Sequence, residues 1–99
     1  MLNINKESIG TALTVTLEGR LDTNTSPELD AELKSVLADV KTLTFDMTKL
    51  AYISSAGLRV LLSAQKVMNK QGSMTIKNVA PDVMEIFEVT GFSDILTIE

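Results

Sequence analysis

Hydrophobic and polar residues alternate along several short stretches of this chain, which is the period-two pattern of half-buried β-strands. The clearest stretch spans residues 13–17, where Leu13, Val15 and Leu17 alternate with threonines. The same alternation predicts further short strands at residues 2–4, 43–47, 74–76 and 96–98. Residues 8–11 contain a glycine between the first two strands and predict a hairpin connection there.

Between these strands, apolar residues recur at helical spacing. The first helix has two candidate caps. Thr25 and Glu28 have the spacing of a capping box, whereas Ser26-Pro27 fits a cap followed by a first-turn proline. The pattern does not choose between them.

Two further helices follow. One begins near Ser54 or Ser55 and runs to Gly72, which suits a helix C-terminus. Its apolar residues cover a wide arc, so we expect it to be the most buried helix: Leu58, Leu61, Leu62, Ala64, Val67 and Met68. The other helix opens at Pro81 and ends at Gly91.

The order β-β-α-β-α-β-α-β predicts one α/β domain over residues 1–99, built on a single mixed, largely parallel sheet of four to five strands. Parallel strands covered on both faces are normally continuous apolar runs. Here Thr14, Thr16, Thr42 and Thr44 interrupt them at alternate positions. We therefore expect the helices to lie mainly on one face of the sheet and to leave the other face in water.

The composition narrows the possible functions. The 99 residues include no cysteine and no histidine. Disulfides, thiolate metal sites and Ser-His or Cys-His triads are therefore impossible. Neither a Walker lysine loop nor a glycine-rich phosphate fingerprint is present, so we expect neither an enzyme nor a cofactor-binding or metal-binding protein.

The charge points the same way. The net charge is −4, and the nine basic residues are scattered, which argues against nucleic-acid binding. The N-terminal residues do not resemble a signal peptide, and no apolar run is long enough to span a bilayer. We expect a cytoplasmic protein without direct membrane insertion.

Two polar stretches follow predicted strands, at residues 18–22 and 46–59. In open α/β sheets, sites form beyond the C-terminal ends of the strands. Ser55 stands at a helix start, where free N–H groups and the helix dipole favour anions. The alternative is that Ser54 or Ser55 is only an N-cap, worth about 1 kcal/mol, with Gly57 there for packing.

Residues 46–58 (DMTKLAYISSAGL) resemble the signature of STAS domains, specifically the stand-alone bacterial anti-sigma factor antagonists. The resemblance extends over essentially the whole chain and includes residues 19–22 (GRLD) and 89–93 (VTGFS). The chain differs from the family pattern at two positions. Ser54 stands where the family usually has aspartate, and Ala56 where it often has serine or threonine.

The resemblance implies an antagonist that binds an anti-sigma factor serine kinase and releases a sigma factor, and that is switched off when the kinase phosphorylates Ser55. A phosphatase acting on Ser55 is a further implied partner. The alternative is a non-phosphorylated STAS scaffold in a lipid-transporting ABC system or a sensory complex. The expected partner-binding residues are Asp22, Thr23, Ser54, Ser55, Ala56, Gly57 and Arg59.

Four side chains near this segment have less defined roles. Asp22 either contacts the partner, or a metal-nucleotide that the partner holds, or it caps its own loop. Asp46 is expected to structure its loop, and Tyr52 to pack. Arg59 pairs with a partner acid or with a phosphate on Ser55, or it is simply a polar residue on the helix surface.

Overall fold

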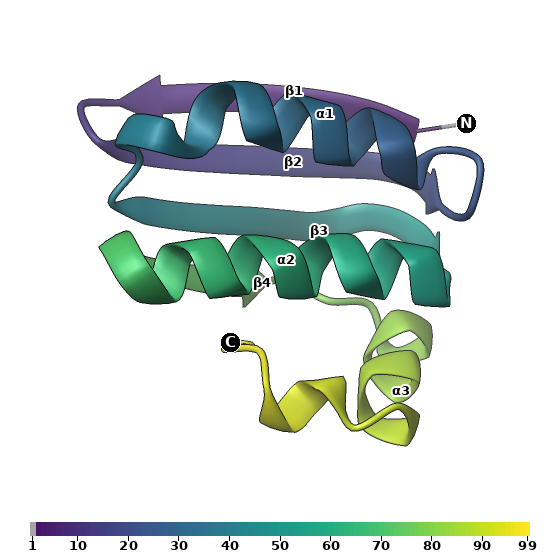
Figure 1. Ribbon diagram of the computed structural model, residues 1–99. Coiled ribbons are helices and arrows are strands. Elements are labelled where there is room, and N and C mark those ends of the chain that lie inside the picture. Colours follow the sequence, from purple (N-terminus) through teal and green to yellow (C-terminus); the bar gives the residue numbers. More distant parts are fainter. Residues whose placement is uncertain (1) are drawn as a thin grey trace.

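A computed structural model describes residues 2–99 as one mixed β-sheet with helices packed on it (Figure 1). The sheet has four strands in the order β1-β2-β3-β4. The elements, in chain order, are β1 (Leu2–Ile9), β2 (Ala12–Leu21), α1 (Ser26–Val36), the 3-10 turn η1 (Leu37–Asp39), β3 (Thr42–Ile53), α2 (Ser55–Gln71), β4 (Ser73–Lys77), α3 (Pro81–Val89) and the 3-10 turn η2 (Phe92–Asp94).

The strand directions agree with the predicted order. β1 and β2 form an antiparallel hairpin, which turns at Gly10 and Thr11, and Gly10 takes a φ of 60°. β2, β3 and β4 are mutually parallel, with α1 and α2 as the crossover helices. The mixed, largely parallel α/β sheet is therefore confirmed.

The two faces of the sheet differ as the threonine pattern predicts. Leu13, Val15, Leu43 and Phe45 are buried, and α1 and α2 lie side by side over one face (Figure 1). Their neighbours alternate with them in exposure: Thr14 and Thr42 are exposed, and Thr16 and Thr44 are half-buried. Period-two patterning therefore identified the face that the helices cover.

The last predicted strand is reduced to a single bridge. Ile98 pairs in parallel with Ile76 of β4 through two hydrogen bonds, Ile76 N–H to Thr97 O and Glu99 N–H to Ile76 O, each 2.9 Å. The sheet thus has four strands, because two bonds around one residue do not extend a ladder. The segment nevertheless buries Leu96 in the core.

Helix α2 is amphipathic, with a narrower buried arc than expected. Leu58, Leu61 and Met68 are buried against the sheet. Leu62 is only half-buried and Val67 is exposed, so their predicted place in the core was wrong. Both lie at the flanks of the arc, where the helix surface turns away from the sheet.

Leu61→Ala and Leu62→Ala should therefore differ in cost. Leu61 is fully buried, and its truncation leaves a cavity that should cost about 2–5 kcal/mol. Leu62→Ala should cost less than about 2 kcal/mol, because the side chain is already partly in water. Urea denaturation measures both, with the exposed Arg59→Ala as a control expected within about 0.5 kcal/mol of the unmodified chain. Equal costs for the two leucines would contradict the burial of this helix.

Candidate functional site

The strand β3 continues through the segment that the sequence suggested was a loop. It ends at Ile53, and Ser54 alone joins it to α2. The pairing with β2 shifts register twice, between Thr16 and Glu18 and between Gly19 and Arg20. Each shift places an extra residue on β3. The two bulges therefore hide the alternation, because buried residues of β3 fall at Met47, Leu50 and Ile53.

Gly19 lies between these two irregularities with a φ of 107°. A side chain is strained at such a φ, which explains the glycine. Beyond it, Arg20 of β2 and Tyr52 of β3 are register partners. The Arg20 guanidinium lies 4.4 Å from the centre of the Tyr52 ring, an arrangement that favours a cation–π contact.

The sequence pattern predicted no role for Arg20, which lies at this end of the sheet. One feature of the sequence could have linked Arg20 to Tyr52. Each of them directly precedes the buried residue that ends its strand, Leu21 or Ile53. Strand register was needed to make them neighbours. Tyr52 does pack, but against an exposed arginine at the sheet end rather than in the core.

The start of α2 separates the roles of the two adjacent serines. Ser54 is the N-cap residue, and its hydroxyl accepts a 3.4 Å hydrogen bond from the Gly57 N–H. Ser55 is the first residue of the helix, and its side chain is exposed. The N–H groups of the first helical turn have no partner within a helix, so an anion beside Ser55 would lie at the positive end of α2.

Gly57 brings α2 into close contact with the ends of β2 and β3. A Cβ added there would lie 2.7 Å from Leu21 Cγ and 2.9 Å from Ile53 Cγ1. Leu21 and Ile53 end their strands side by side, so the missing side chain lets the helix start directly on top of both strand ends. Backbone bonding holds the same place, since Ser54 N–H donates to Leu21 O at 2.9 Å.

The loop after β2 is organised by Asp22. Its Oδ1 accepts bonds from the backbone N–H groups of Asn24 and Thr25, both at 3.0 Å, and from the Thr25 hydroxyl at 3.2 Å. These donors, the Thr25 N–H first, lower the pKa of Asp22 below its ordinary value. Asp22 therefore caps its own loop, which was one of the two roles expected of it.

These bonds also decide the start of α1. Thr25 occupies the N-cap position, but its hydroxyl oxygen accepts the Asp22 N–H at 2.9 Å, and its O–H points to Arg20 O and Asp22 Oδ1 rather than into the helix. The capping box with Glu28 therefore does not form. Ser26 is the first helical residue, followed by Pro27, and its hydroxyl donates to Asp22 O at 2.5 Å.

Several of the predicted partner-binding residues line one shallow hollow. Thr23 from the β2–α1 loop meets Ala56, Arg59 and Val60 of α2 there, with Pro27 of α1 beside them. Arg59 is exposed and forms no ion pair within residues 2–99. Asp22 is hydrogen-bonded within the β2–α1 loop beside Thr23. The hollow thus joins the two polar stretches into one surface.

Asp46 lies away from this surface and structures another part of β3. Its Oδ1 accepts the Thr48 hydroxyl at 2.6 Å and the Thr48 N–H at 3.0 Å, and Asn78 Nδ2 donates to it at 3.3 Å. The Thr48 hydroxyl contributes most to lowering the pKa of Asp46. The carboxylate thus fastens the bulged part of β3 to the β4–α3 connection, as its expected loop-structuring role requires.

The described part of the chain offers little to a cation. Among residues 2–99, no three acidic side chains gather closely enough to hold a metal ion. None of the helices in this range is long and apolar enough to cross a membrane.

The profile of the STAS domain family matches residues 3–99. The chain is a STAS domain. BtrV of Bordetella bronchiseptica, named as an anti-sigma factor antagonist, is 33% identical over 99 residues, which cover 98% of this chain and 85% of that protein. The match to the STAS family therefore extends over nearly all of the described fold and includes both polar stretches.

Solved structures share this STAS fold at low sequence identity. An anti-sigma factor antagonist from Mycobacterium paratuberculosis superposes with a TM-score of 0.89 at 20% identity, over 99% of this chain and 85% of that one. The Bacillus cell fate determinant SpoIIAA in its phosphorylated form gives 0.76 at 17% identity, over 98% and 91%. At these identities the likeness concerns the fold.

The contact at Gly57 generates a stability prediction for this STAS domain. Gly57→Ala should destabilise the chain by about 1–3 kcal/mol, because the new methyl group must displace Leu21 or Ile53 in a packed core. Alanine is the better helix former by only about 1 kcal/mol, so the clash decides the sign. Urea denaturation measures the change, with the exposed Ser55→Ala as a neighbouring control. A stabilised Gly57→Ala chain would contradict the close packing.

The lowered pKa of Asp46 generates a pH prediction. Because the folded state favours the charged carboxylate, its contribution is fully present above the unfolded value near 3.8 and is lost as the pH falls through the folded pKa. Thr48→Ala removes the main donor, so it should raise the pKa of Asp46 and lessen this acid-dependent loss. Carboxyl NMR titration measures the pKa. Thr48→Ser keeps the hydroxyl and is the matched control; equal Asp46 pKa values in both variants would refute the assignment.

Proposed function

We propose that this STAS domain is an anti-sigma factor antagonist. In this proposal it binds an anti-sigma factor serine kinase through the start of α2 and frees a sigma factor, until phosphorylation of Ser55 switches it off. The observation that carries the proposal is the exposed Ser55 as first residue of a 17-residue helix, beside a cap that Ser54 already supplies. The relationship to BtrV supports the same function.

Local geometry favours Ser55 over Ser54 as the phosphorylated residue. The Ser54 hydroxyl accepts a bond from Gly57 N–H, and its modification would remove the cap of α2. The exposed Ser55 can carry the group outside the helix, next to the N–H groups of the first turn. Arg59 lies one turn further on the same side of α2 and adds positive charge. A phosphate of about −1.5 to −2 charge is therefore tolerated by the domain itself.

Phosphorylation would act on the complex rather than on the fold. A partner surface that closes over a neutral serine would have to bury an unpaired dianion after modification. A buried unpaired charge costs several kcal/mol, and about 1.4 kcal/mol is a tenfold change in affinity. The expected result is a large loss of affinity without unfolding.

The proposed contact surface combines both polar stretches. It includes Thr23, Ala56 and Arg59 around Ser55, with Asp22 holding the shape of the β2–α1 loop. Gly57, which the resemblance placed among the contact residues, is buried against Leu21 and Ile53 and supports the helix start instead. We propose a binding module without catalytic activity of its own, acting in the cytoplasm. A phosphatase that removes the phosphate from Ser55 would complete the cycle.

A second candidate is a constitutive scaffold that uses the same surface without phosphorylation, as in a lipid-transporting ABC system or a sensory complex. The observation that favours it is the departure from the family pattern on both sides of Ser55, at Ser54 and Ala56. The two candidates share the fold and the surface, and they differ in whether Ser55 accepts a phosphate.

Incubation with ATP and the cognate anti-sigma factor should add one phosphate to Ser55, detected by mass spectrometry of the peptides. Ser55→Ala should abolish the modification and bind the kinase constitutively. Ser55→Asp should weaken the complex in part, since a single carboxylate carries less charge than a phosphate. Circular dichroism should show all forms folded.

Ser54→Ala is the matched control, because it removes the neighbouring hydroxyl while leaving Ser55 in place. The modification should persist in this variant, at some cost to helix stability. Binding to the kinase with no phosphate at Ser55 would refute the switch and favour the constitutive scaffold.

A further inference from the structure

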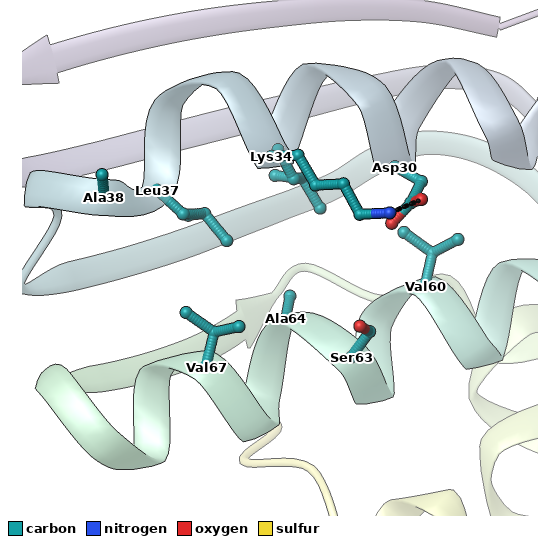
Figure 2. Close-up of a pocket in the computed structure, with 9 residues that line it drawn as sticks. Asp30, Lys34, Leu37, Ala38, Val60, Ser63, Ala64 and Val67 are labelled. Atoms are coloured by element: carbon teal, nitrogen blue, oxygen red, sulfur yellow. Dashed lines mark ion pairs between the residues drawn. The ribbon is translucent and has the colours of Figure 1, made fainter.

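A groove of about 230 Å³ runs between α1 and α2 on the outer side of the helix layer (Figure 2). Val60, Ala64 and Val67 of α2 point toward α1 and η1, and Leu37 and Ala38 of η1 line the opposite side of the groove. The polar pair on the α1 side, Asp30 and Lys34, is neutralised by its own 2.9 Å ion pair. The groove is therefore mainly apolar, with Ser63 as an uncharged polar residue in its lining.

The residues of α2 that line this groove repeat at helical intervals. Val60, Ser63 and Val67 line it with Ala64 beside them, and Ala56 of the neighbouring hollow continues the stripe, so that spacings of four, three and four span about three turns from Ala56 to Val67. The stripe contains small side chains, so another backbone can come close. Two adjacent helices with such a seam present the surface that a third helix packs against.

A basic strip borders the groove on α2. Arg59, Lys66 and Lys70 are exposed and lie at i, i+7 and i+11, on one side of the helix. α2 contains no acidic residue, although the chain as a whole has a net charge of −4. Within residues 2–99 none of the three basic residues forms an ion pair. The charge on this strip is complementary to an acidic partner.

These features fit a protein helix better than a membrane surface. A helix that lies in a membrane surface carries bulky apolar residues such as Leu, Phe or Trp on its exposed face. Val67, at 39% exposure, is the large hydrophobic residue that α2 exposes, and its buried leucines face the sheet. A concave seam of small residues cannot insert into lipid.

The groove is continuous with the proposed partner site. Val60 lines both the groove and the hollow that contains Thr23, Ala56 and Arg59. We infer that the α1–α2 groove docks an acidic amphipathic helix of the anti-sigma factor, whose apolar stripe lies in the seam and whose acidic residues face Lys66 and Lys70. This inference rests on the proposed function, since it assigns a second contact to the same partner.

Calorimetric titration of the full chain with its cognate anti-sigma factor tests the groove separately from Ser55. Lys66→Glu should weaken binding about tenfold, mainly through slower association at low salt, and Val67→Asp should weaken it about tenfold or more. Lys49→Glu and Val89→Asp make the same chemical changes at exposed positions on other elements, and should stay within about twofold. Urea denaturation checks that all four variants fold.

The position of the partner helix is read by cross-linking. The chain has no cysteine, so Ser63→Cys gives a single attachment point for a photo-cross-linker at the groove. The cross-link should map to an acidic, amphipathic helical segment of the anti-sigma factor. A cross-link to a basic or extended segment would overturn the inference.

Two binding outcomes tell the two proposals apart. If Ser55→Asp weakens the complex while Lys66→Glu and Val67→Asp bind like the controls, the groove assignment is wrong and the proposed function stands. If the anti-sigma factor does not bind the unmodified chain at all, the proposed function fails and this inference fails with it.

Other occupants of the groove have their own signatures. Sedimentation that shows a dimer dissociated by Val67→Asp would assign the groove to a second copy of this chain. Binding to phosphatidylglycerol vesicles that is lost in Lys66→Glu would assign the strip to a membrane. Either result would overturn the inference.

Discussion

The close packing of Gly57 on Leu21 and Ile53 is the constraint on which the site depends. These two apolar residues end adjacent parallel strands, and the glycine lets α2 begin directly above them. The helix start is thereby fixed relative to the β2–α1 loop, because Ser54 N–H also bonds to Leu21 O. Ser55, Ala56 and Arg59 consequently share one surface with Thr23, although about thirty residues of chain separate them. A flexible linker at this point would leave two unrelated polar loops.

The bulges of β3 serve the same arrangement. Two extra residues lengthen the strand so that Ile53 reaches the level of Leu21, and they turn Arg20 and Tyr52 toward each other at the sheet end. The carboxylate of Asp46 holds the first irregularity through Thr48 and ties it to Asn78. Several residues of the family-like motif thus act on strand geometry, and Ser55 is left exposed at the helix start, where the proposed partner would make contact.

The helix start at Ser55 and the groove between α1 and α2 therefore have different physical roles. The start of α2 combines an exposed hydroxyl with a helix dipole, and it can change its charge without loss of the cap that Ser54 provides. The groove between α1 and α2 has a mainly apolar lining, and the basic strip of Arg59, Lys66 and Lys70 borders it on α2. A partner that contacts both regions would gain stable affinity from the groove and regulation from the serine. In this proposal, one charge change at Ser55 would release an interface that also includes the groove.

The sequence by itself determined the α/β class, the number and order of the helices, the face of the sheet that they cover, and the helix start that carries Ser55. These follow from local periodicity and from capping residues, which act within one or two turns or strand pairs.

The tertiary structure decided what depends on pairing between distant segments. The extension of β3 to Ile53 was hidden because bulges break the alternation of apolar residues, and the fifth strand shrank to a bridge at Ile98. The cap of α1 was decided by Asp22, whose backbone N–H donates to the Thr25 hydroxyl oxygen that would otherwise accept from the helix. Leu62 and Val67 left the core because the flank of a helix is buried only where a neighbouring element covers it, and no periodicity within α2 encodes where its neighbours lie.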